Sequence, residues 1–268
     1  MSQYTFGFIG CGNMGGALAL AASKSIPAHQ LAVCDSDASK TEFLTQSGKA
    51  TLADLSEVVN CSKYIFLGVK PQGMASLFQK ISPMLQKRGD RFVLVSMAAG
   101  VSISKIEHMA GVNCAVIRMM PNTPVSVGTG MILYDANEKT TAEDVDGFLE
   151  GLSAAGRMDR LSEGLIDAAG ALSGCGPAFV YLFAEGLADG GVACGLPREK
   201  ARLYAAQTLL GAAEMLLKTG RLPGELKDAV CSPGGTTIAG VHALEEGAFR
   251  ADSMNAVIAA FEKTKTLK

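Results

Sequence analysis

The sequence lacks the features by which metal-binding, secreted and nucleic-acid-binding proteins are usually identified. Its seven cysteines are odd in number and include no CxxC pair, so they give no zinc-type spacing and favour free thiols in a reducing compartment. A net charge of −2 provides no large attraction to nucleic acid or to an anionic membrane. We expect no signal peptide, because no basic segment followed by a long apolar run stands at the N-terminus. No uninterrupted apolar run reaches the roughly 18 residues that span a bilayer. We therefore expect a cytoplasmic protein with no metal, nucleic-acid or membrane partner.

The composition is that of an ordinary folded protein. The chain has 268 residues, of which 48% are hydrophobic and 19% are charged. This length allows one large or two medium domains with a sizeable core. The sequence contains no internal repeat, charge block or low-complexity linker.

The first half of the chain alternates short apolar runs with segments of helical periodicity. Such alternation predicts an α/β fold, with a mostly parallel sheet covered by helices on both faces. Thr140 and Glu143 have the spacing of a capping box at the last of these helices. We expect strands at 4–9, 31–34, 64–69, 92–96 and 114–119, an edge strand at 130–134 and a last strand at 156–161. We expect helices at 14–25, 39–47, 54–60, 74–84, 103–109 and 142–153.

The second half changes character after about Leu161, where strand-like runs become scarce. Helical patterns extend over 162–194, with a break near Gly176–Pro177, and over 198–218, 237–246 and 251–265. Apolar residues fall on more than one face of these helices, so another surface must cover them. We expect an all-α dimerisation domain at 162–268 and a homodimer formed by packing two such domains.

The sharpest local signal is the run GCGNMG at Gly10–Gly15, which follows the first expected strand and opens the first expected helix. In a dinucleotide-binding loop, Gly10 permits the tight turn, Gly12 lets the backbone approach a pyrophosphate, and Gly15 lets helix and strand pack closely. The helix start then offers free N–H groups to phosphate. A plain strand–helix turn is the alternative, but the context favours a Rossmann-type domain at residues 1–161.

Asp35 ends the second expected strand, about 20 residues after the last of these glycines, where an acid often holds the ribose 2′-hydroxyl. A carboxylate there repels the 2′-phosphate of NADPH, which favours NADH. If Asp35 turns away, Ser36 and Ser39 offer hydrogen bonds to that phosphate instead. The expected cofactor is therefore NADPH or NADH.

Motifs outside the glycine loop narrow the function, because this fold serves many chemistries. The strand ends carry VKP at 69–71, SMAAGV at 96–101 and RMMPNTP at 118–124, and the helical half carries LSGCGPAF at 172–179 and LKDAVCSPGGTT at 226–237. In this order the motifs resemble the pyrroline-5-carboxylate reductase family, over nearly the whole chain from Phe8 to about Lys265. The stretch from Leu226 to Glu245 resembles the family's signature. The chain departs from the commonest pattern at Cys175, where a serine is usual.

The resemblance implies an oxidoreductase that reduces 1-pyrroline-5-carboxylate to L-proline with NAD(P)H, the last step of proline biosynthesis. It implies that the pyrophosphate lies at Asn13 and Met14 and the nicotinamide near Val69, Lys70, Pro71, Ala98 and Ala99. It implies that the substrate carboxylate is received, largely by backbone N–H groups, at Ser232, Gly234, Gly235 and Thr236. The hydroxyl of Thr237 is then expected to face the ring nitrogen. The family's pocket lies between subunits, which implies a homodimer or a larger homo-oligomer built from dimers.

The residues of the 232–237 run support a carboxylate site on physical grounds as well. The run precedes a helical pattern, so several N–H groups point outward at a helix start, as in the dinucleotide loop. The helix dipole adds about 0.3–1 kcal/mol for an anion, and up to about 2 kcal/mol if the site is partly buried. An N-cap turn without a ligand is the alternative. It accounts for one serine or threonine, but not for two glycines followed by two threonines.

The reaction requires a hydride at carbon and a proton on nitrogen. The imine can arrive already protonated from water, so the protein needs no strong acid. This agrees with the presence of only three histidines, none of them at an expected catalytic position. We expect Thr237 to orient the iminium nitrogen. Lys70 either steers charge or relays a proton, or it is a structural lysine at a strand end.

Two other functions compete with this one. A β-hydroxyacid-type dehydrogenase also pairs a Rossmann domain with helices, but it needs a base, and the corresponding run at 174–181 contains no lysine. A dinucleotide-binding regulatory protein without catalysis would be indicated by loss of Thr237 or of Gly234–Gly235, and all are present. The sequence leaves open the choice of NADH or NADPH, the oligomer beyond the dimer, the proton donor and activity on six-membered imines.

Overall fold

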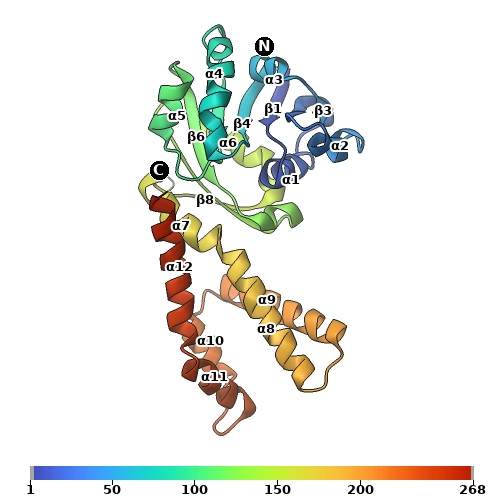
Figure 1. Ribbon diagram of the computed structural model, residues 1–268, viewed down its shortest axis with the longest axis vertical. Helices are drawn as coiled ribbons and strands as arrows, with labels where there is room; N and C mark the ends of the chain where they lie inside the picture. Colours follow the sequence, from blue (N-terminus) through green and yellow to red (C-terminus); the bar gives the residue numbers. More distant parts are fainter. Residues whose placement is uncertain (1–2, 267–268) are drawn as a thin grey trace. The chain divides into compact units, whose positions relative to one another are not determined.

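The computed structural model describes residues 3–266, and the contacts within the chain divide it into two compact units. The sheet unit comprises Met1–Cys175 and Ala260–Lys268, and the helical unit comprises Gly176–Ala259. Figure 1 shows the strands gathered in the sheet unit and helices alone in the described part of the helical unit. The expected combination of an α/β domain with a following all-α domain is confirmed.

The sheet has eight strands: β1 (Tyr4–Ile9), β2 (Leu31–Cys34), β3 (Thr51–Leu52), β4 (Ser62–Leu67), β5 (Val93–Ser96), β6 (Ala115–Met120), β7 (Gly130–Ala136) and β8 (Gly156–Arg160). Their order is β3-β2-β1-β4-β5-β6-β7-β8, and neighbours run parallel except β6 and β7. The prediction that 130–134 forms an edge was wrong, because β7 lies between β6 and β8 and the latter takes the edge. The two-residue β3 is too short to show a period and was not expected.

Helices cover both faces of the sheet. Helices α1 (Asn13–Ala22), α2 (Ser39–Thr45) and α6 (Ala142–Gly151) contribute to the core on one face. Helices α3 (Leu55–Cys61), α4 (Met74–Leu85) and α5 (Ile103–Ala110) contribute to the core on the other face. Strands covered on both sides are apolar where both faces are buried, which is why β4 ends in the continuous run YIFL rather than alternating.

An aromatic cluster fills the core between α6 and the centre of the sheet. The rings of Phe8 and Phe66 stack with their centroids 4.3 Å apart, and Phe6 lies 4.8 Å from Phe66. Helix α6 approaches closely because it places glycine over these rings. A Cβ atom on Gly151 would lie 2.3 Å from Cζ of Phe6. The phenol of Tyr64 donates a hydrogen bond of 2.8 Å to the Asp144 carbonyl, which fixes the other end of α6.

The capping box of α6 lies one residue later than expected. Thr141, rather than Thr140, caps the helix, and its partner is Asp144 rather than Glu143. Thr140 instead donates a hydrogen bond to Asn137 Oδ1 at 2.9 Å. Burial alone would raise the pKa of Asp144, but hydrogen bonds from Arg91 and Thr141 outweigh it and lower that pKa. Asp144, rather than the neighbouring Glu143, therefore completes the capping box, because Asp144 also pairs with Arg91.

Helix α7 (Glu163–Ser173) is fastened to the sheet by a buried ion pair. The guanidinium of Arg118 on β6 is 4% exposed, donates to Asp167 at 2.5 Å and lies 3.3 Å from the Glu163 carboxylate. The amide of Asn122 donates a hydrogen bond of 2.9 Å to the Ser173 carbonyl at the other end of the helix. These contacts place α7 in the sheet unit.

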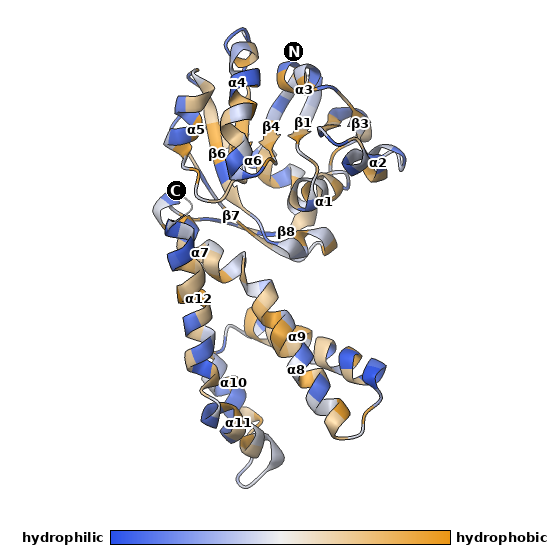
Figure 2. Ribbon diagram, viewed as in Figure 1, coloured by the Kyte–Doolittle hydropathy of each residue, from blue (hydrophilic) through white to orange (hydrophobic). Residues whose placement is uncertain are grey.

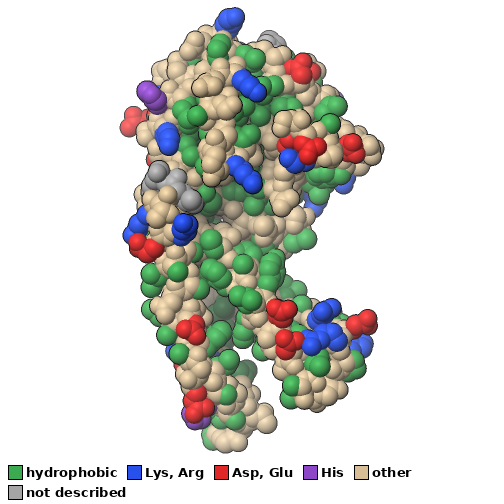
Figure 3. Space-filling view, in the orientation of Figure 1, with side chains coloured by type: hydrophobic (Ala, Val, Ile, Leu, Met, Phe, Trp, Pro, Cys, Tyr) green, Lys and Arg blue, Asp and Glu red, His purple; other side chains and the backbone are tan. Residues whose placement is uncertain are grey.

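The helical unit contains α8 (Gly176–Ala193), α9 (Arg198–Thr219), α10 (Pro223–Ala229), α11 (Thr236–Glu246) and the first part of α12 (Phe249–Lys265). Helix α10 was not expected, because its seven residues carry too few apolar positions. The buried cluster of this unit consists of Ala188, Ala201 and Ala205. Large apolar side chains instead lie on its surface, and Leu182 and Leu217 are 70% and 71% exposed. Figure 2 colours much of the ribbon of these helices as hydrophobic, and Figure 3 shows hydrophobic side chains on the visible surface. One chain therefore leaves the apolar faces of this unit uncovered.

The helical stretch Glu163–Ala193 is long and apolar enough, by length and composition, to cross a membrane. It comprises α7, the two residues that follow it and α8, and it includes the charged residues Glu163, Asp167, Glu185 and Asp189. Glycines and acidic residues interrupt its apolar residues, so it contains no continuous apolar run of that length. A helix of a protein without a membrane span can have the same length and apolar composition when it packs against another protein surface.

The close packing of α6 predicts the effect of enlarging Gly151. In Gly151→Ala the added methyl group overlaps the Phe6 ring, so we expect the free energy of unfolding to fall by about 1–3 kcal/mol. Urea denaturation at equal protein concentrations measures this change. Gly164→Ala, in the first turn of α7 with no atom within 4 Å of its Cβ position, is the matched control and should be neutral or slightly stabilising. Equal stability of the two variants would contradict the packing argument.

Candidate functional site

A cleft of about 1050 Å³ opens at the carboxyl ends of β1, β2 and β4. The chain order reverses at this point, since β2 and β3 follow β1 on one side and β4 to β6 lie on its other side. Open α/β sheets bind ligands at such a switch point, outside the carboxyl ends of the strands. The cleft brings together seven of the predicted cofactor residues: Gly10, Gly12, Asn13, Met14, Asp35, Val69 and Lys70.

The glycine loop owes its shape to two close backbone contacts. Gly10 has φ of +94°, a conformation that side chains disfavour. A Cβ atom on Gly15 would lie 2.0 Å from the Gly10 carbonyl oxygen, and one on Gly68 would lie 2.3 Å from the same atom. Gly15 therefore does not line the cleft but permits α1 to begin directly behind the loop, as predicted. Gly68 was missed, although a glycine at the end of a buried strand often marks such a contact.

The N terminus of α1 faces the cleft with free donors. In the described chain no side chain caps this helix, whose N-cap residue is Gly12. No atom lies within 4 Å of the Cβ position of Gly12, so the loop is open on that side. Uncapped N–H groups at a helix start bind phosphate oxygens. The loop therefore fits a pyrophosphate.

Asp35 lines the cleft, but its carboxylate also shapes the loop. Its Oδ2 atom accepts a hydrogen bond of 2.7 Å from the Cys11 N–H, and its Oδ1 atom accepts one of 2.9 Å from the Asp37 N–H. Lys40 Nζ lies 3.7 Å from Oδ1. The side chain is 8% exposed. Ser36 lines the cleft beside it, whereas Ser39 does not line it and hydrogen-bonds to Asp37.

The residues expected near the nicotinamide fall into two groups. Val69 and Lys70 follow β4 and line the cleft, and Lys70 has an exposed side chain. Pro71 opens a short 3-10 turn (Pro71–Gly73) and does not line the cleft. Ala98 and Ala99 follow β5, which pairs with β4, and they do not line the cleft either. Ala98 is buried, and its N–H donates to Ser96 Oγ at 3.3 Å.

Several cleft residues were missed by the sequence analysis. The segment after β3 contributes Ala53, Asp54 and Leu55. Because β3 was not predicted, no binding residues were expected at its carboxyl end. Helix α4 contributes side chains spaced three or four residues apart, a helical spacing that was available from the sequence. These are Ser76, Leu77 and Lys80. Lys40 on α2, Gly73, Ile9 and Cys34 were missed as well.

Two buried cysteines lie beside the glycine loop, Cys11 within it and Cys34 at the end of β2, where it lines the cleft. Burial raises the pKa of the Cys11 thiol to about 12, and burial likewise raises that of Cys34 to about 12. Both thiols are therefore neutral at physiological pH and pack as small apolar groups. The structure assigns them no part in covalent chemistry.

The second predicted site lies in the helical unit, in the loop before α11. Gly234 has φ of +70°, a conformation that favours glycine, and a Cβ atom on Gly235 would lie 2.4 Å from Ser232 Oγ and 3.1 Å from the Ser232 carbonyl oxygen, so the turn is tight at both positions. No side chain of the described residues caps α11, whose N-cap residue is Gly235. Thr236 and Thr237 form its exposed first turn. The loop thus repeats the uncapped helix start found in the cleft, and such a start fits a carboxylate.

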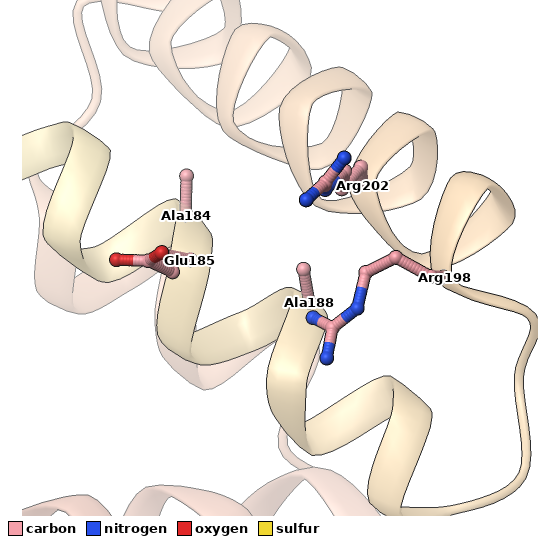
Figure 4. Close-up of a pocket in the computed structure, with 5 residues that line it drawn as sticks. All are labelled: Ala184, Glu185, Ala188, Arg198 and Arg202. Carbon is pink, nitrogen blue, oxygen red and sulfur yellow. The ribbon is translucent and has the colours of Figure 1, made fainter.

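A smaller cavity of about 230 Å³ lies between α8 and α9 of the helical unit. Figure 4 shows Ala184, Glu185 and Ala188 projecting from α8 and Arg198 and Arg202 from α9. Arg198 also pairs with Asp189. The cavity contains none of the predicted site residues.

Two family models match the chain. One describes "pyrroline-5-carboxylate reductase dimerisation" and matches residues 163–267. The other describes "NADP oxidoreductase coenzyme F420-dependent" and matches residues 5–100, which include the glycine loop.

Curated relatives match over the full length. The pyrroline-5-carboxylate reductase of Pisum sativum is 42% identical over 267 residues, which are 99% of this chain and 96% of that protein. That of Escherichia coli K12 is 39% identical over 264 residues, 97% of each chain.

Solved structures agree with this similarity. The pyrroline carboxylate reductase of Plasmodium falciparum, crystallised with NADP bound, superposes with a TM-score of 0.86 at 33% identity, covering 100% of this chain and 99% of that one. The reductase of Coxiella burnetii superposes with a TM-score of 0.89 at 30% identity, covering 100% and 99%.

Alanine substitutions at Gly15 and Gly12 are predicted to weaken cofactor binding for different reasons. Gly15→Ala places a methyl group 2.0 Å from a backbone oxygen, so we expect the loop to shift, with lower stability and at least about tenfold weaker binding of an adenine dinucleotide. Gly12→Ala has free space, so its free energy of unfolding should change by less than about 0.5 kcal/mol, while the methyl group obstructs the phosphates. Thermal unfolding and calorimetric titration separate these effects. A Gly15→Ala protein with unchanged stability and affinity would disprove the close contact.

Proposed function

The chain belongs to the pyrroline-5-carboxylate reductase family, and on that premise we propose which of its residues reduce 1-pyrroline-5-carboxylate to L-proline with NAD(P)H. This reaction completes proline biosynthesis. The observation that carries the proposal is the uncapped N terminus of α1, which faces the cleft at the reversal of strand order. Neither the dehydrogenase nor the regulatory alternative has an observation in its favour.

The cleft residues bind and orient the cofactor. When bound, NAD(P)H supplies the hydride. The N–H groups of Asn13 and Met14 at the start of α1 hold the pyrophosphate, and Gly12 leaves room for it. Val69 and Lys70 form the cleft wall beside the nicotinamide. Pro71, Ala98 and Ala99 stay predicted neighbours of that ring, although they do not line the cleft of the single chain.

The loop before α11 binds the substrate carboxylate. Ser232, Gly234, Gly235 and Thr236 surround an uncapped helix start, and their N–H groups donate to the carboxylate oxygens. Rigid positioning of the imine carbon supplies much of the rate, and the conformation of Gly234 fixes this loop.

Thr237 holds the ring nitrogen through its hydroxyl, in the first turn of α11. The imine is protonated by water before it binds, so the protein needs no general acid. His242 fits this view, because it is 72% exposed and lies 4.0 Å from Glu246 on its own helix. Lys70 is the ionisable side chain proposed to steer charge beside the reacting atoms.

The protein is a homo-oligomer, and its finer assembly is part of the proposal. We assign dimerisation to residues 162–268, and the match to the dimerisation model at 163–267 supports this assignment. The exposed apolar side chains of α8 and α9 are the surface that a second copy would cover. The loop before α11 of one subunit is proposed to face the cofactor of the other. The cytoplasm is the proposed location, in keeping with seven free cysteines.

The proposal is tested by oxidation of each nicotinamide cofactor by the purified protein in the presence of 1-pyrroline-5-carboxylate. Turnover that yields proline is the expected result. Binding of the cofactor without turnover would overturn it. A six-membered cyclic imine, run in parallel, measures how closely the pocket fits its ring.

Thr237→Ala tests the placement of the ring nitrogen. Loss of one active-site hydrogen bond should lower kcat/KM by the equivalent of about 1–3 kcal/mol, without a change in cofactor affinity. Thr237→Ser keeps the hydroxyl and should recover most of the activity. If the alanine variant has normal kinetics, Thr237 plays no part in the reaction.

A further inference from the structure

Two carboxylates share one ammonium group after β2, beside the dinucleotide cleft. Lys40 Nζ lies 3.7 Å from Asp35 Oδ1 and 3.7 Å from Asp37 Oδ2. Asp37 also accepts hydrogen bonds of 2.6 Å from the Ser39 hydroxyl and 3.2 Å from the Ser39 N–H, and these lower its pKa. The group therefore contains two carboxylates and one ammonium group, and Lys40 already pairs with both Asp35 and Asp37.

The side chain of Asp35 cannot rotate away from the cleft without losing two hydrogen bonds to backbone N–H groups. Its two oxygens accept the N–H groups of Cys11 and Asp37, at 2.7 Å and 2.9 Å, and its side chain is nearly buried. The first of these bonds holds the glycine loop itself. The carboxyl group of Asp35 is therefore held at the rim of the cleft, beside the glycine loop and the end of β2, where this fold binds the adenosine ribose. This excludes the arrangement in which Asp35 swings out and leaves Ser36 and Ser39 to receive a phosphate.

The segment that follows β2 offers no cation besides Lys40, which the two carboxylates already neutralise. Residues 35–45 contain one lysine and no arginine, the residue that most often receives a 2′-phosphate bidentately. Asp54, which also lines the cleft, adds another carboxylate, and hydrogen bonds from Glu57 N–H and Ser56 lower its pKa. A phosphate monoester brings a charge of about −1.5 to −2 at pH 7, whereas a ribose hydroxyl brings none and can donate to a carboxylate.

We propose that the Asp35–Lys40–Asp37 group makes this enzyme prefer NADH over NADPH, and that Asp37 is a specificity-determining residue that acts by neutralising Lys40. The inference rests on the proposed function only for the identity of the cofactor. Asp37 does not line the cleft, so its effect is electrostatic and separable from the loop-holding role of Asp35. Removing Asp37 leaves Lys40 paired with Asp35 alone, so the group becomes neutral and repels a phosphate less.

The test compares binding of 5′-ADP and 2′,5′-ADP to the full-length protein by calorimetric titration, with no imine present. The expected result is that 5′-ADP binds at least about tenfold more tightly to the wild type. Asp37→Ala should narrow that ratio by about fivefold, the size of one exposed charge pair. Glu42→Ala, which removes an exposed acid of α2 that has no ion pair within the described chain, is the matched control and should leave the ratio unchanged.

Two further variants locate the cation responsible. The double variant Asp37→Ala with Lys40→Met should restore the wild-type ratio, because the gain requires the positive charge of Lys40. Tighter binding of 2′,5′-ADP to the wild type would overturn the inference, as would an Asp37→Ala ratio equal to that of Glu42→Ala. If Lys80→Met abolished binding of 2′,5′-ADP while Asp37→Ala had no effect, Lys80 would be the phosphate residue and the inference would fail.

The ratio of kcat/KM for NADH and NADPH with 1-pyrroline-5-carboxylate is expected to follow the binding ratio. Nucleotide binding tests the cofactor preference, whereas turnover of the imine tests the proposed function. A protein that binds 5′-ADP selectively but does not turn over the imine would contradict the proposed function and support this inference. A protein that turns over the imine with a preference for NADPH would support the function and overturn the inference.

Discussion

The site depends on the close approach of two glycines to the backbone carbonyl oxygen of a third. Gly15 at the start of α1 and Gly68 at the end of β4 both lie so close to the Gly10 carbonyl that neither position has room for a Cβ atom. This contact lets the helix begin immediately behind the loop, and it keeps the first N–H groups of the helix directed at the cleft. The dinucleotide cleft at the reversal of strand order is therefore a consequence of backbone packing, and the side chains around it adjust affinity and selectivity.

Most of the sheet unit could be predicted because its signals are local. Apolar runs such as that of β4 specify strands covered on both sides, and the glycine spacing specifies the loop. The errors arose where tertiary contacts decide. Thr141 caps α6 instead of Thr140 because Asp144 also pairs with Arg91, a residue far away in the sequence. The segment at Ala53–Leu55 was missed because the two-residue strand before it has no period to detect.

The functional residues divide in the same way. The glycines of both loops could be identified, since paired glycines directly before a helix expose the N–H groups that an anion needs. The orientation of Asp35 could not, because it depends on which N–H groups lie within reach of its oxygens once the loop has folded. The helical unit was recognisable by its excess of apolar positions, and the structure bears this out by leaving residues such as Leu182 and Leu217 exposed in one chain. That excess marks a surface that another protein covers, because a unit whose buried cluster is three alanines gains little from its own core.

The ion pair between Arg118 and Asp167 bears on how this enzyme can be divided. Its guanidinium is buried on β6, and its Nε atom has no hydrogen-bond partner in the described chain, so it already carries a desolvation penalty. A shortened protein that stopped at residue 161 would take away both of its carboxylates and leave a positive charge alone in the interior. A dinucleotide domain made by itself should therefore extend through Ser173, and swapping helical halves between related reductases should exchange them after α7, where the join leaves every buried charge with its counterion.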